Sequence, residues 1–224
     1  MSEAIESSKR PSRAERREAL LEVAAREFAS GGWGETSVDQ IARAAGVSAP
    51  VLYTHFGSKR GLFIELLERH GAALIERIST SVAAQSTPEA QTRASIEAFF
   101  DFVSADPFAW RTLFRDPAAD QEIAGRQRAA QNEATHLIAS MFVAGGAPED
   151  RIEDVTLVAQ LFKSALNGIA GWWWEHRDIN RAHLTELAHQ TLWHGIGSLP
   201  GTGPTGPVPT SARGELLGRV EVTD

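Results

Sequence analysis

Apolar residues recur along this chain at the three-to-four-residue spacing of α-helices. The shortest clear stripe has apolar residues at i, i+3, i+4 and i+7, namely Val38, Ile41, Ala42 and Ala45. Two pairs fit a capping box at its start, Ser37 with Gln40 or Thr36 with Asp39. Gly46 can take the left-handed conformation that ends a helix. The pattern therefore predicts a short helix that needs neighbours to be stable.

A second short helix is predicted after about three residues, the spacing of a helix-turn-helix. Ser48 can cap this helix, and Pro50 falls in its first turn, where its missing N–H matters little. Leu52 and Phe56 lie at i and i+4 and face inward. A longer helix over 13–30 precedes the pair. Its apolar stripe can roof the helix-turn-helix and consists of Leu21, Ala24, Ala25 and Phe28.

Prolines divide the rest of the chain into helical blocks, since proline is accepted at a helix start and rejected in its interior. A helix capped by Ser58 is predicted to reach about residue 84. Further helices are predicted over 88–105, 107–114, 118–144, 148–176 and 180–197. Abundant Ala, Leu, Glu and Arg and short β-branched runs favour an all-α fold.

The outer face of the second short helix suits a DNA major groove. Ala49, Pro50, Tyr53 and Thr54 point away from the buried side, and small residues let a helix approach base edges. Four side chains could donate to phosphates at the groove edges, namely Tyr53, Thr54, His55 and Lys59. The alternative is an ordinary helical hairpin with a surface tyrosine and histidine.

The formal net charge of −7 at first argues against a polyanionic partner, but the charges are unevenly distributed. Residues 1–60 carry nine Lys/Arg against eight Asp/Glu, and the remainder carries thirteen against twenty-one. The segment 1–12 reads as a mobile basic arm that leads into the first helix. Lys9, Arg10 and Arg13 are expected to contact the minor groove. A solvated tail without a function is the alternative.

Composition and motifs exclude several kinds of site. The chain has no cysteine, so it forms no disulfide or thiolate zinc site. No apolar run approaches the roughly 18 residues of a membrane span, and we expect a cytoplasmic protein. No phosphate loop, histidine pair or nucleophile elbow indicates an enzyme, cofactor or metal. Glu186 and His189 have a spacing more typical of a surface salt bridge than of a metal site.

The N-terminal residues resemble the DNA-binding motif of TetR-family transcriptional regulators over about 13–67. The resemblance is carried by Ile41-Ala42, Ala45-Gly46-Val47-Ser48, Leu52-Tyr53, His55-Phe56 and Ser58-Lys59. Trp33 stands where the family more often has Tyr or Phe. The resemblance implies phosphate contacts from Thr36 or Ser37, Tyr53, His55 and Lys59. It implies base contacts from Ser48, Ala49, Pro50 and Thr54.

The C-terminal part is rich in aromatic residues, which could form an ordinary core or surround a ligand. TetR-family relatives hold small effectors in this domain. The segment 98–116, AFFDFVSADPFAWRTLFRD, resembles the subgroup that senses long-chain acyl-CoA. That resemblance implies an apolar tunnel lined by Phe99, Phe102, Trp110, Phe114, Leu137, Leu161 and Phe162. It places Arg111 or Arg115 near an anionic head.

The last two long helices carry apolar residues on more than one face, which indicates burial against a second chain. The expected interface consists of Leu157, Ala165, Gly168, Trp172, Leu187, Thr191 and Trp193. The family resemblance implies a two-fold homodimer that binds palindromic DNA. A monomer with an internally buried helix is the alternative.

Together these patterns predict a ligand-responsive DNA-binding regulator, more a repressor than an activator, whose effector is a hydrophobic small molecule or acyl-CoA. A helical ligand-binding or enzymatic domain without a regulatory role is the alternative. The expected organisation is a basic arm over 1–12, a helix-turn-helix domain over 13–60, a ligand-binding and dimerisation domain over 61–198, and a flexible Pro/Gly-rich tail over 199–224.

Overall fold

The computed structural model describes residues 12–115, 120–144, 146 and 149–195, and every regular element in them is helical. The all-α prediction is confirmed. The N-terminal helices are α1 (Arg13–Glu35), α2 (Val38–Ala44), α3 (Ala49–Phe56) and α4 (Lys59–Ala83). The others are α5 (Pro88–Ala105), α6 (Pro107–Trp110), α7 (Gln121–Ala144), α8 (Ile152–Glu175) and α9 (Arg181–His194). Two short turns complete them, a π-helical turn (Arg111–Arg115) and a 3-10 turn (Glu149–Arg151).

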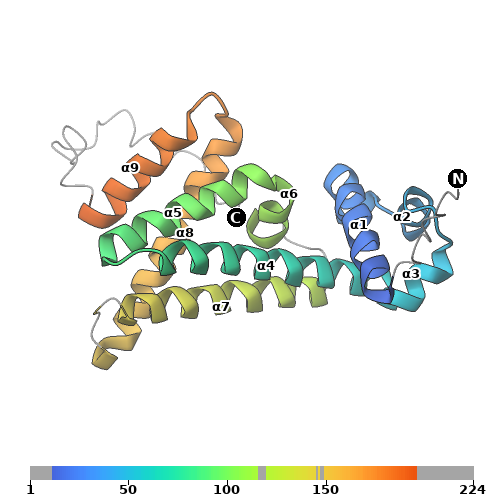
Figure 1. Cartoon of the computed structure of the whole chain (residues 1–224), viewed down its shortest axis with the longest axis horizontal. Helices are drawn as coiled ribbons and strands as arrows, with labels where there is room; N and C mark the ends of the chain where they lie inside the picture. Colours follow the sequence, from blue (N-terminus) through green and yellow to red (C-terminus); the bar gives the residue numbers. More distant parts are fainter. Residues whose placement is uncertain (1–11, 116–119, 145, 147–148, 196–224) are drawn as a thin grey trace, which may run out of the picture.

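Helix α4 connects the two parts of the molecule. Figure 1 shows α1, α2 and α3 gathered at one end, with α4 running from them along the length of the protein. Helices α5 and α7 both pack on α4, α8 packs on α7, and α9 packs on α5. We call α1–α3 the head and the helices from α5 onward the body. The head and the body therefore share one long helix.

The head has its own core, which the predicted stripes form. Leu21, Ala24 and Phe28 of α1 are buried against Leu52 and Phe56 of α3, and Ala25 is half-buried. This confirms that the first helix covers the helix-turn-helix. The core also takes in the start of α4 and one residue of α7, Ile123, so the head packs on the body as well.

The caps of the short helices follow from local hydrogen bonds. Ser37 accepts from the Gln40 N–H at 3.1 Å, and the Gln40 side chain accepts from the Ser37 N–H at 2.7 Å. This pair, and not Thr36 with Asp39, is the capping box of α2. Gly46 has a φ of +65°, as its predicted role at the helix end requires. Ser48 occupies the N-cap of α3 without a capping hydrogen bond from its side chain.

Several boundaries differ from the sequence prediction. Helix α1 continues past Ser30 to Glu35, interrupted only at Gly32, whose φ is +69° and ψ 178°. The helix predicted over 107–114 is a short α-helix followed by the π-helical turn, and α8 begins at Ile152, not at Pro148. Lys9 and Arg10 of the basic arm and the tail 199–224 lie outside the described residues. No helix in the described part of the chain is long and apolar enough to cross a bilayer.

The body has a second core in which aromatic side chains dominate. Phe100 and Trp110 are fully buried, and Phe99, Phe102 and Trp173 are nearly so. Phe100 meets Trp173 edge-on, with ring centroids 6.1 Å apart. These contacts join α5 to α8 and fix the wall behind the ligand cavity described below.

Candidate DNA interface and ligand cavity

Helix α3 presents the outer face that DNA recognition needs. Leu52 and Phe56 are buried, whereas Tyr53 on the opposite side is 50% exposed. Pro50 and Thr54 are also exposed, and the Thr54 hydroxyl donates to the Pro50 carbonyl at 2.8 Å. Ser48 is exposed and Ala49 half-buried at the first turn. The predicted base-contacting residues thus begin at the N-terminal end of α3 with Ser48, Ala49 and Pro50, where small side chains leave room for base edges, and continue to Thr54 one turn later.

Arg17 of α1 fixes the other end of α3. Its guanidinium donates to the His55 carbonyl and to both carboxylate oxygens of Glu65 on α4, and one of the latter bonds is 2.7 Å long. The guanidinium also lies 4.6 Å from the centre of the Phe56 ring. The sequence pattern did not reveal this role. The structure shows that Arg17 holds three helices together from within the head.

Two of the predicted phosphate contacts are engaged inside the head. Thr36 is buried, and its hydroxyl donates to the carbonyls of Glu27 and Gly32 at 3.2 and 2.8 Å. Lys59 donates to the Trp33 carbonyl, and its ammonium lies 4.4 Å from the centre of the Trp33 ring. Burial lowers the pKa of Lys59, against the opposing effect of the Glu35 carboxylate. Both side chains close the C-terminal end of α1.

The remaining predicted contacts are more accessible. Ser37 and Arg13 are exposed, whereas His55 is half-buried with its Nδ1 atom enclosed and without a hydrogen-bond partner. Of the two alternatives for the phosphate contact before α2, the burial of Thr36 therefore favours Ser37. Ser37 and Tyr53 are therefore exposed, as a phosphate contact requires.

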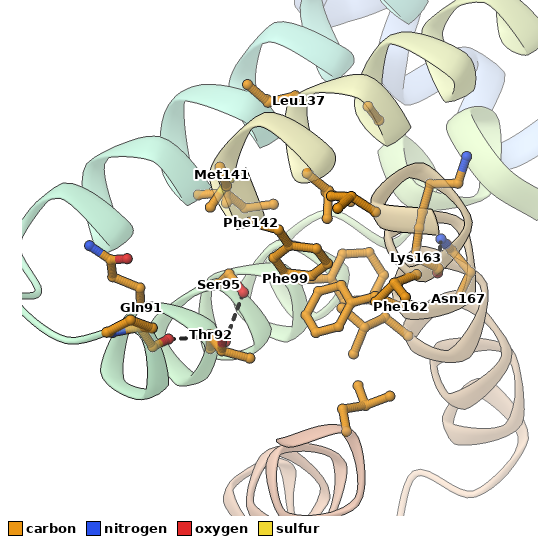
Figure 2. Close-up of a pocket in the computed structure, with 18 of the residues that line it drawn as sticks. Gln91, Thr92, Ser95, Phe99, Leu137, Met141, Phe142, Phe162, Lys163 and Asn167 are labelled. Atoms are coloured by element: carbon orange, nitrogen blue, oxygen red, sulfur yellow. Dashed lines mark hydrogen bonds between the residues drawn. The ribbon is translucent and has the colours of Figure 1, made fainter. Parts of the chain in front are cut away.

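The body encloses an apolar cavity of about 640 Å³, within the size range of small-molecule sites. Side chains from α4, α5, α7, α8 and α9 line it, as does Phe114 of the π-helical turn. Figure 2 shows Phe99, Phe142 and Phe162 gathered between α5, α7 and α8, with Leu137 and Met141 on α7 above them. Of the predicted lining residues, the structure brings four to this cavity, namely Phe99, Phe114, Leu137 and Phe162.

The other predicted lining residues lie elsewhere. Phe102, one helical turn after Phe99, faces a different cavity, and Leu161 is 61% exposed. Trp110 is buried in the core and reaches the cavity only through Asn167, whose side-chain oxygen accepts from the indole N–H at 3.1 Å. Adjacent residues of a helix point in different directions. Because Phe162 points into the cavity, its neighbour Leu161 points away from it.

The predicted arginines also face away from this cavity. Arg111 lies over the Trp174 ring at 5.7 Å, and Arg115 pairs with Glu175 at 3.1 Å. The π-helical turn that carries them directs both toward the C-terminal end of α8. Neither side chain lines the cavity, so the placement of a charged head beside them is not supported.

A buried lysine at the cavity wall was not foreseen. Lys163 of α8 is only 8% exposed, and its ammonium donates to the Gln131 carbonyl at 2.7 Å and to the Thr135 hydroxyl at 2.6 Å. Burial lowers the pKa of Lys163. In Figure 2 the side chain leaves α8 beside Phe162. A lysine adjacent to the apolar stripe of a long helix is the sequence signal that could have revealed it.

The predicted dimer residues form an exposed apolar face on α8 and α9. Leu157, Trp172 and Leu187 are 60%, 48% and 47% exposed, and Trp193 is 39% exposed. Leu161 belongs to this face rather than to the cavity. Ala165 and Gly168 lie along the same side of α8, and Thr191 donates to the Leu187 carbonyl at 2.8 Å. A run of exposed large apolar side chains of this kind is typical of a protein–protein interface.

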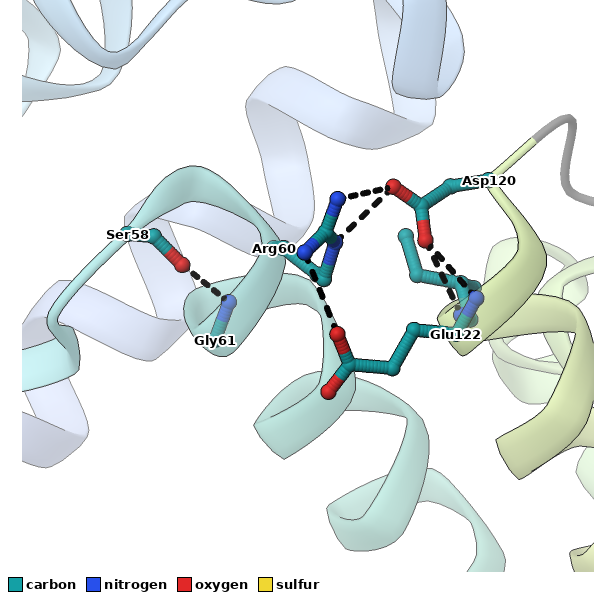
Figure 3. Close-up of polar contacts among 6 residues, drawn as sticks. Ser58, Arg60, Gly61, Asp120 and Glu122 are labelled. Atoms are coloured by element: carbon teal, nitrogen blue, oxygen red, sulfur yellow. Dashed lines mark hydrogen bonds and ion pairs between the residues drawn. The ribbon is translucent and has the colours of Figure 1, made fainter.

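An ion-pair cluster joins the start of α4 to the start of α7 (Figure 3). Arg60 donates to Asp120 at 2.8 Å and to Glu122 at 3.1 Å. Asp120 in turn accepts from the N–H groups of Glu122 and Ile123 and caps α7. Burial alone would raise the pKa of Asp120, but Arg60 and these N–H groups lower it. Because α7 also lines the cavity, this cluster connects the cavity to the head.

Glu186 and His189 do not pair with each other in the described part of the chain. Glu186 pairs with Arg93 at 2.6 Å, whereas His189 is buried in the body with both ring nitrogens unpartnered. The predicted surface salt bridge between them is therefore not formed. Across the described ranges, no three His, Asp or Glu side chains are arranged to hold a metal ion.

Comparison with known proteins agrees with both parts of this arrangement. Residues 20–66 match the family described as bacterial regulatory proteins of the tetR family, and residues 88–195 match a tetracyclin repressor-like C-terminal domain. The HTH-type transcriptional activator FasR of Mycolicibacterium smegmatis is 32% identical over 192 residues, which cover 84% of this chain and 86% of FasR.

Solved structures show the same fold. A TetR-like transcriptional regulator from Rhodococcus sp. RHA1 is 27% identical, covers 85% of this chain and 100% of its own, and has a TM-score of 0.68. FadR from Bacillus subtilis, solved with stearoyl-CoA, is 17% identical with a TM-score of 0.69 and covers 80% of this chain and 98% of its own. The chain therefore belongs to the TetR family of ligand-responsive, DNA-binding transcriptional regulators and is not an enzyme.

Proposed function

We propose that this protein regulates transcription as a homodimer whose affinity for a palindromic operator is set by a long-chain acyl-CoA. The observation that carries the proposal is the apolar cavity of about 640 Å³, whose walls include Phe99, Phe142 and Phe162. An acyl chain offers only apolar surface to such walls, and its burial there is favourable. We further propose that the protein acts in the cytoplasm, where its DNA and acyl-CoA partners meet.

The similar proteins support the acyl-CoA assignment by their ligands. FadR from Bacillus subtilis was solved with stearoyl-CoA, and AibR was solved with isovaleryl coenzyme A and operator DNA. Both share the fold with this chain at low sequence identity, 17% and 19%. We propose that an acyl chain occupies the cavity of this chain. The coenzyme group would remain outside, because an apolar space of about 640 Å³ suits the acyl chain alone.

The exposed face of α8 and α9 supports the homodimer. Leu157, Leu161 and Trp172 lie on one side of α8, and Leu187 and Trp193 extend the face on α9. We propose that a second copy related by a two-fold axis buries this apolar face. Two copies of α3 would then read two half-sites about one helical turn apart on the DNA.

The mechanism follows from the shared helices. An acyl chain between α5, α7 and α8 favours the position of α7 that accommodates it, and α7 is tied to α4 through Asp120, Glu122 and Arg60. Helix α4 leads directly into α3 through Gly57 and Ser58. The ligand thus shifts the population of dimers whose α3 helices match successive major grooves.

The direction of regulation is a separate question with a direct test. The sequence favours a repressor, whereas FasR is named an activator. A reporter gene behind the chain's own upstream DNA distinguishes them. Lower expression in the presence of the protein identifies a repressor, and higher expression identifies an activator.

The cavity assignment is tested by blocking the cavity from α7. Ala134 lines the cavity, whereas Ala129 on the same helix is exposed and does not. Operator binding is measured by fluorescence anisotropy while short-, medium- and long-chain acyl-CoA are titrated. We expect long chains to change the affinity of the wild type and of Ala129→Trp, and to have no effect on Ala134→Trp. A response that survives Ala134→Trp would refute the cavity as the effector site.

A further inference from the structure

The effector cavity and the apolar face of the body share part of their surface. Val158 of α8 lines the cavity and is 51% exposed, and Trp193 of α9 lines it and is 39% exposed. Helix α8 packs on α7 and helix α9 packs on α5, and within the described ranges α8 and α9 make no extensive contact with each other. The two side chains that border both the cavity and the solvent thus come from two helices that are not packed together.

The helical period places Val158 between the inner and the outer side of α8. Phe162, four residues later, lines the cavity and is buried, whereas Leu161, three residues later, is exposed on the apolar face. Residues three and four apart on a helix are neighbours, so Val158 lies next to both. The cavity wall and the apolar face are therefore continuous across Val158.

The border of the cavity at α8 and α9 suits a copy of itself. A surface that meets its own copy across a two-fold axis brings like charges together, so a surface without net charge is favoured. Arg151 and Asp154 line the cavity at the start of α8 and pair with each other at 2.7 Å. The neighbouring exposed side chains Leu157, Leu161 and Trp193 are uncharged. TetR-family regulators act as dimers, which makes a second copy the partner that this border fits.

We propose that the second copy closes the effector cavity, because the apolar face of one copy covers the border at Val158 and Trp193 of the other. This inference rests on the proposed homodimer and adds that the cavity of a single chain is incomplete. An acyl chain in the closed cavity is removed from water on all sides, whereas in a single chain part of it stays in contact with water. Effector binding and dimerisation therefore stabilise each other.

The test uses single cysteines, since the chain has none of its own. Ser95→Cys places a thiol in the cavity, because Ser95 lines it and is buried, one turn before Phe99 on α5 (Figure 2). Ser140→Cys is the matched control. Ser140 is an exposed serine of α7 outside the cavity, and like Ser95 it donates its hydroxyl to a carbonyl of its own helix. Alkylation by iodoacetamide is followed by mass spectrometry in the dimer and in a Leu161→Glu background, which is expected to be monomeric.

We expect Ser95→Cys to react about tenfold faster in the Leu161→Glu background than in the dimer, and Ser140→Cys to react equally in both. Thr185→Cys, buried on α9 outside the cavity, should react slowly in both. Equal rates for Ser95→Cys, a matching acceleration of Thr185→Cys, or a Leu161→Glu protein that remains a dimer would overturn the proposal. If circular dichroism shows that Leu161→Glu does not fold, Leu187→Glu on the α9 part of the face replaces it.

A second measurement tests the link to the effector. Sedimentation equilibrium of the wild type gives the dimer dissociation constant with and without palmitoyl-CoA below its micellar concentration. We expect the constant to fall about tenfold with the ligand bound. An unchanged constant, in protein to which calorimetry shows palmitoyl-CoA binding, would overturn the link. If calorimetry shows no binding, the acyl-CoA assignment fails, and the alkylation rates still decide whether a second copy closes the cavity.

Discussion

The head and the body of this protein recognise their partners with surfaces of different origin. In the head, the outer face of α3 consists of residues that are neighbours in the sequence, from Ser48 to Thr54. In the body, the cavity is assembled from five helices that span residues 74–193. The head is therefore defined by local structure, whereas the body depends on packing between distant segments, and we propose that a second chain covers its apolar α8–α9 face.

We expect the largest effect from a substitution that disrupts the apolar face of the body. Leu161→Glu places a charge in the middle of the exposed stripe of α8, where burial against a second copy would leave it unpaired. We expect a folded monomer, and a loss of operator affinity of roughly a hundredfold because two linked half-site contacts become one. Analytical ultracentrifugation and fluorescence anisotropy measure the two outcomes.

Ala129→Glu is the control for Leu161→Glu, since Ala129 is exposed on α7 away from that face. It should remain a dimer with full affinity. If Leu161→Glu also remains a dimer at micromolar concentration, the α8–α9 face is not the interface, and the body would be as self-contained as the head.

The next effect lies in the head and involves a single side chain. Tyr53 is half-exposed on α3 and contributes nothing to the core, so Tyr53→Ala should leave the melting temperature unchanged. We expect operator affinity to fall about tenfold through the loss of one phosphate contact and the ring packing around it. Tyr53→Phe isolates the hydroxyl. Unchanged affinity in Tyr53→Ala, measured by anisotropy at several salt concentrations, would show that α3 does not use this face.

A third effect concerns stability and contrasts Lys163 of the body with Lys59 of the head. Lys59 is half-buried and lies beside the Trp33 ring, whereas Lys163 is buried with only neutral acceptors around its ammonium. We expect Lys163→Met to raise the free energy of unfolding by about 1 kcal/mol, because an apolar side chain of similar length replaces an unpaired buried charge. Urea unfolding measures the difference.

The pH dependence of this difference has a definite sign. Burial places the folded-state pKa of Lys163 below its ordinary value of 10.5, so the unfolded chain binds the proton more tightly. The wild type is therefore penalised at neutral pH and recovers stability as pH rises through the window between the lowered pKa and 10.5. The advantage of Lys163→Met should shrink in that window. An advantage that is constant with pH would attribute the effect to packing alone.

The difference between head and body also explains what the sequence could predict. The capping box at Ser37, the positive φ of Gly46 and the inward positions of Leu52 and Phe56 all depend on residues within four positions of one another. These predictions are confirmed. Nothing local distinguishes Ser37 from Thr36 as a cap, and only the packing of Thr36 against the end of α1 decides between them.

In the body the same reasoning succeeded for helices and failed for side-chain directions. Phe99 and Phe162 face the cavity as expected, but Phe102 and Leu161 point in other directions on the same helices. The π-helical turn adds a residue to the helical cycle and redirects Arg111. Such directions are set by the packing of several helices at once, which a single sequence does not display.

The smallest expected effect tests whether head and body communicate through Arg60. Its bonds to Asp120 and Glu122 lie on the surface, so Arg60→Gln should change operator affinity without ligand by no more than two- to threefold. The ratio of affinities with and without long-chain acyl-CoA should instead move toward one, since α7 would no longer be tied to the start of α4. Arg126 offers a matched control, because it also joins α7 to α4, through Glu68 at 3.5 Å, but farther from the head. If Arg126→Gln reduces the ratio as strongly as Arg60→Gln, the coupling is spread along the whole α4–α7 contact, and the position of the Arg60 cluster beside α3 has no special part in it.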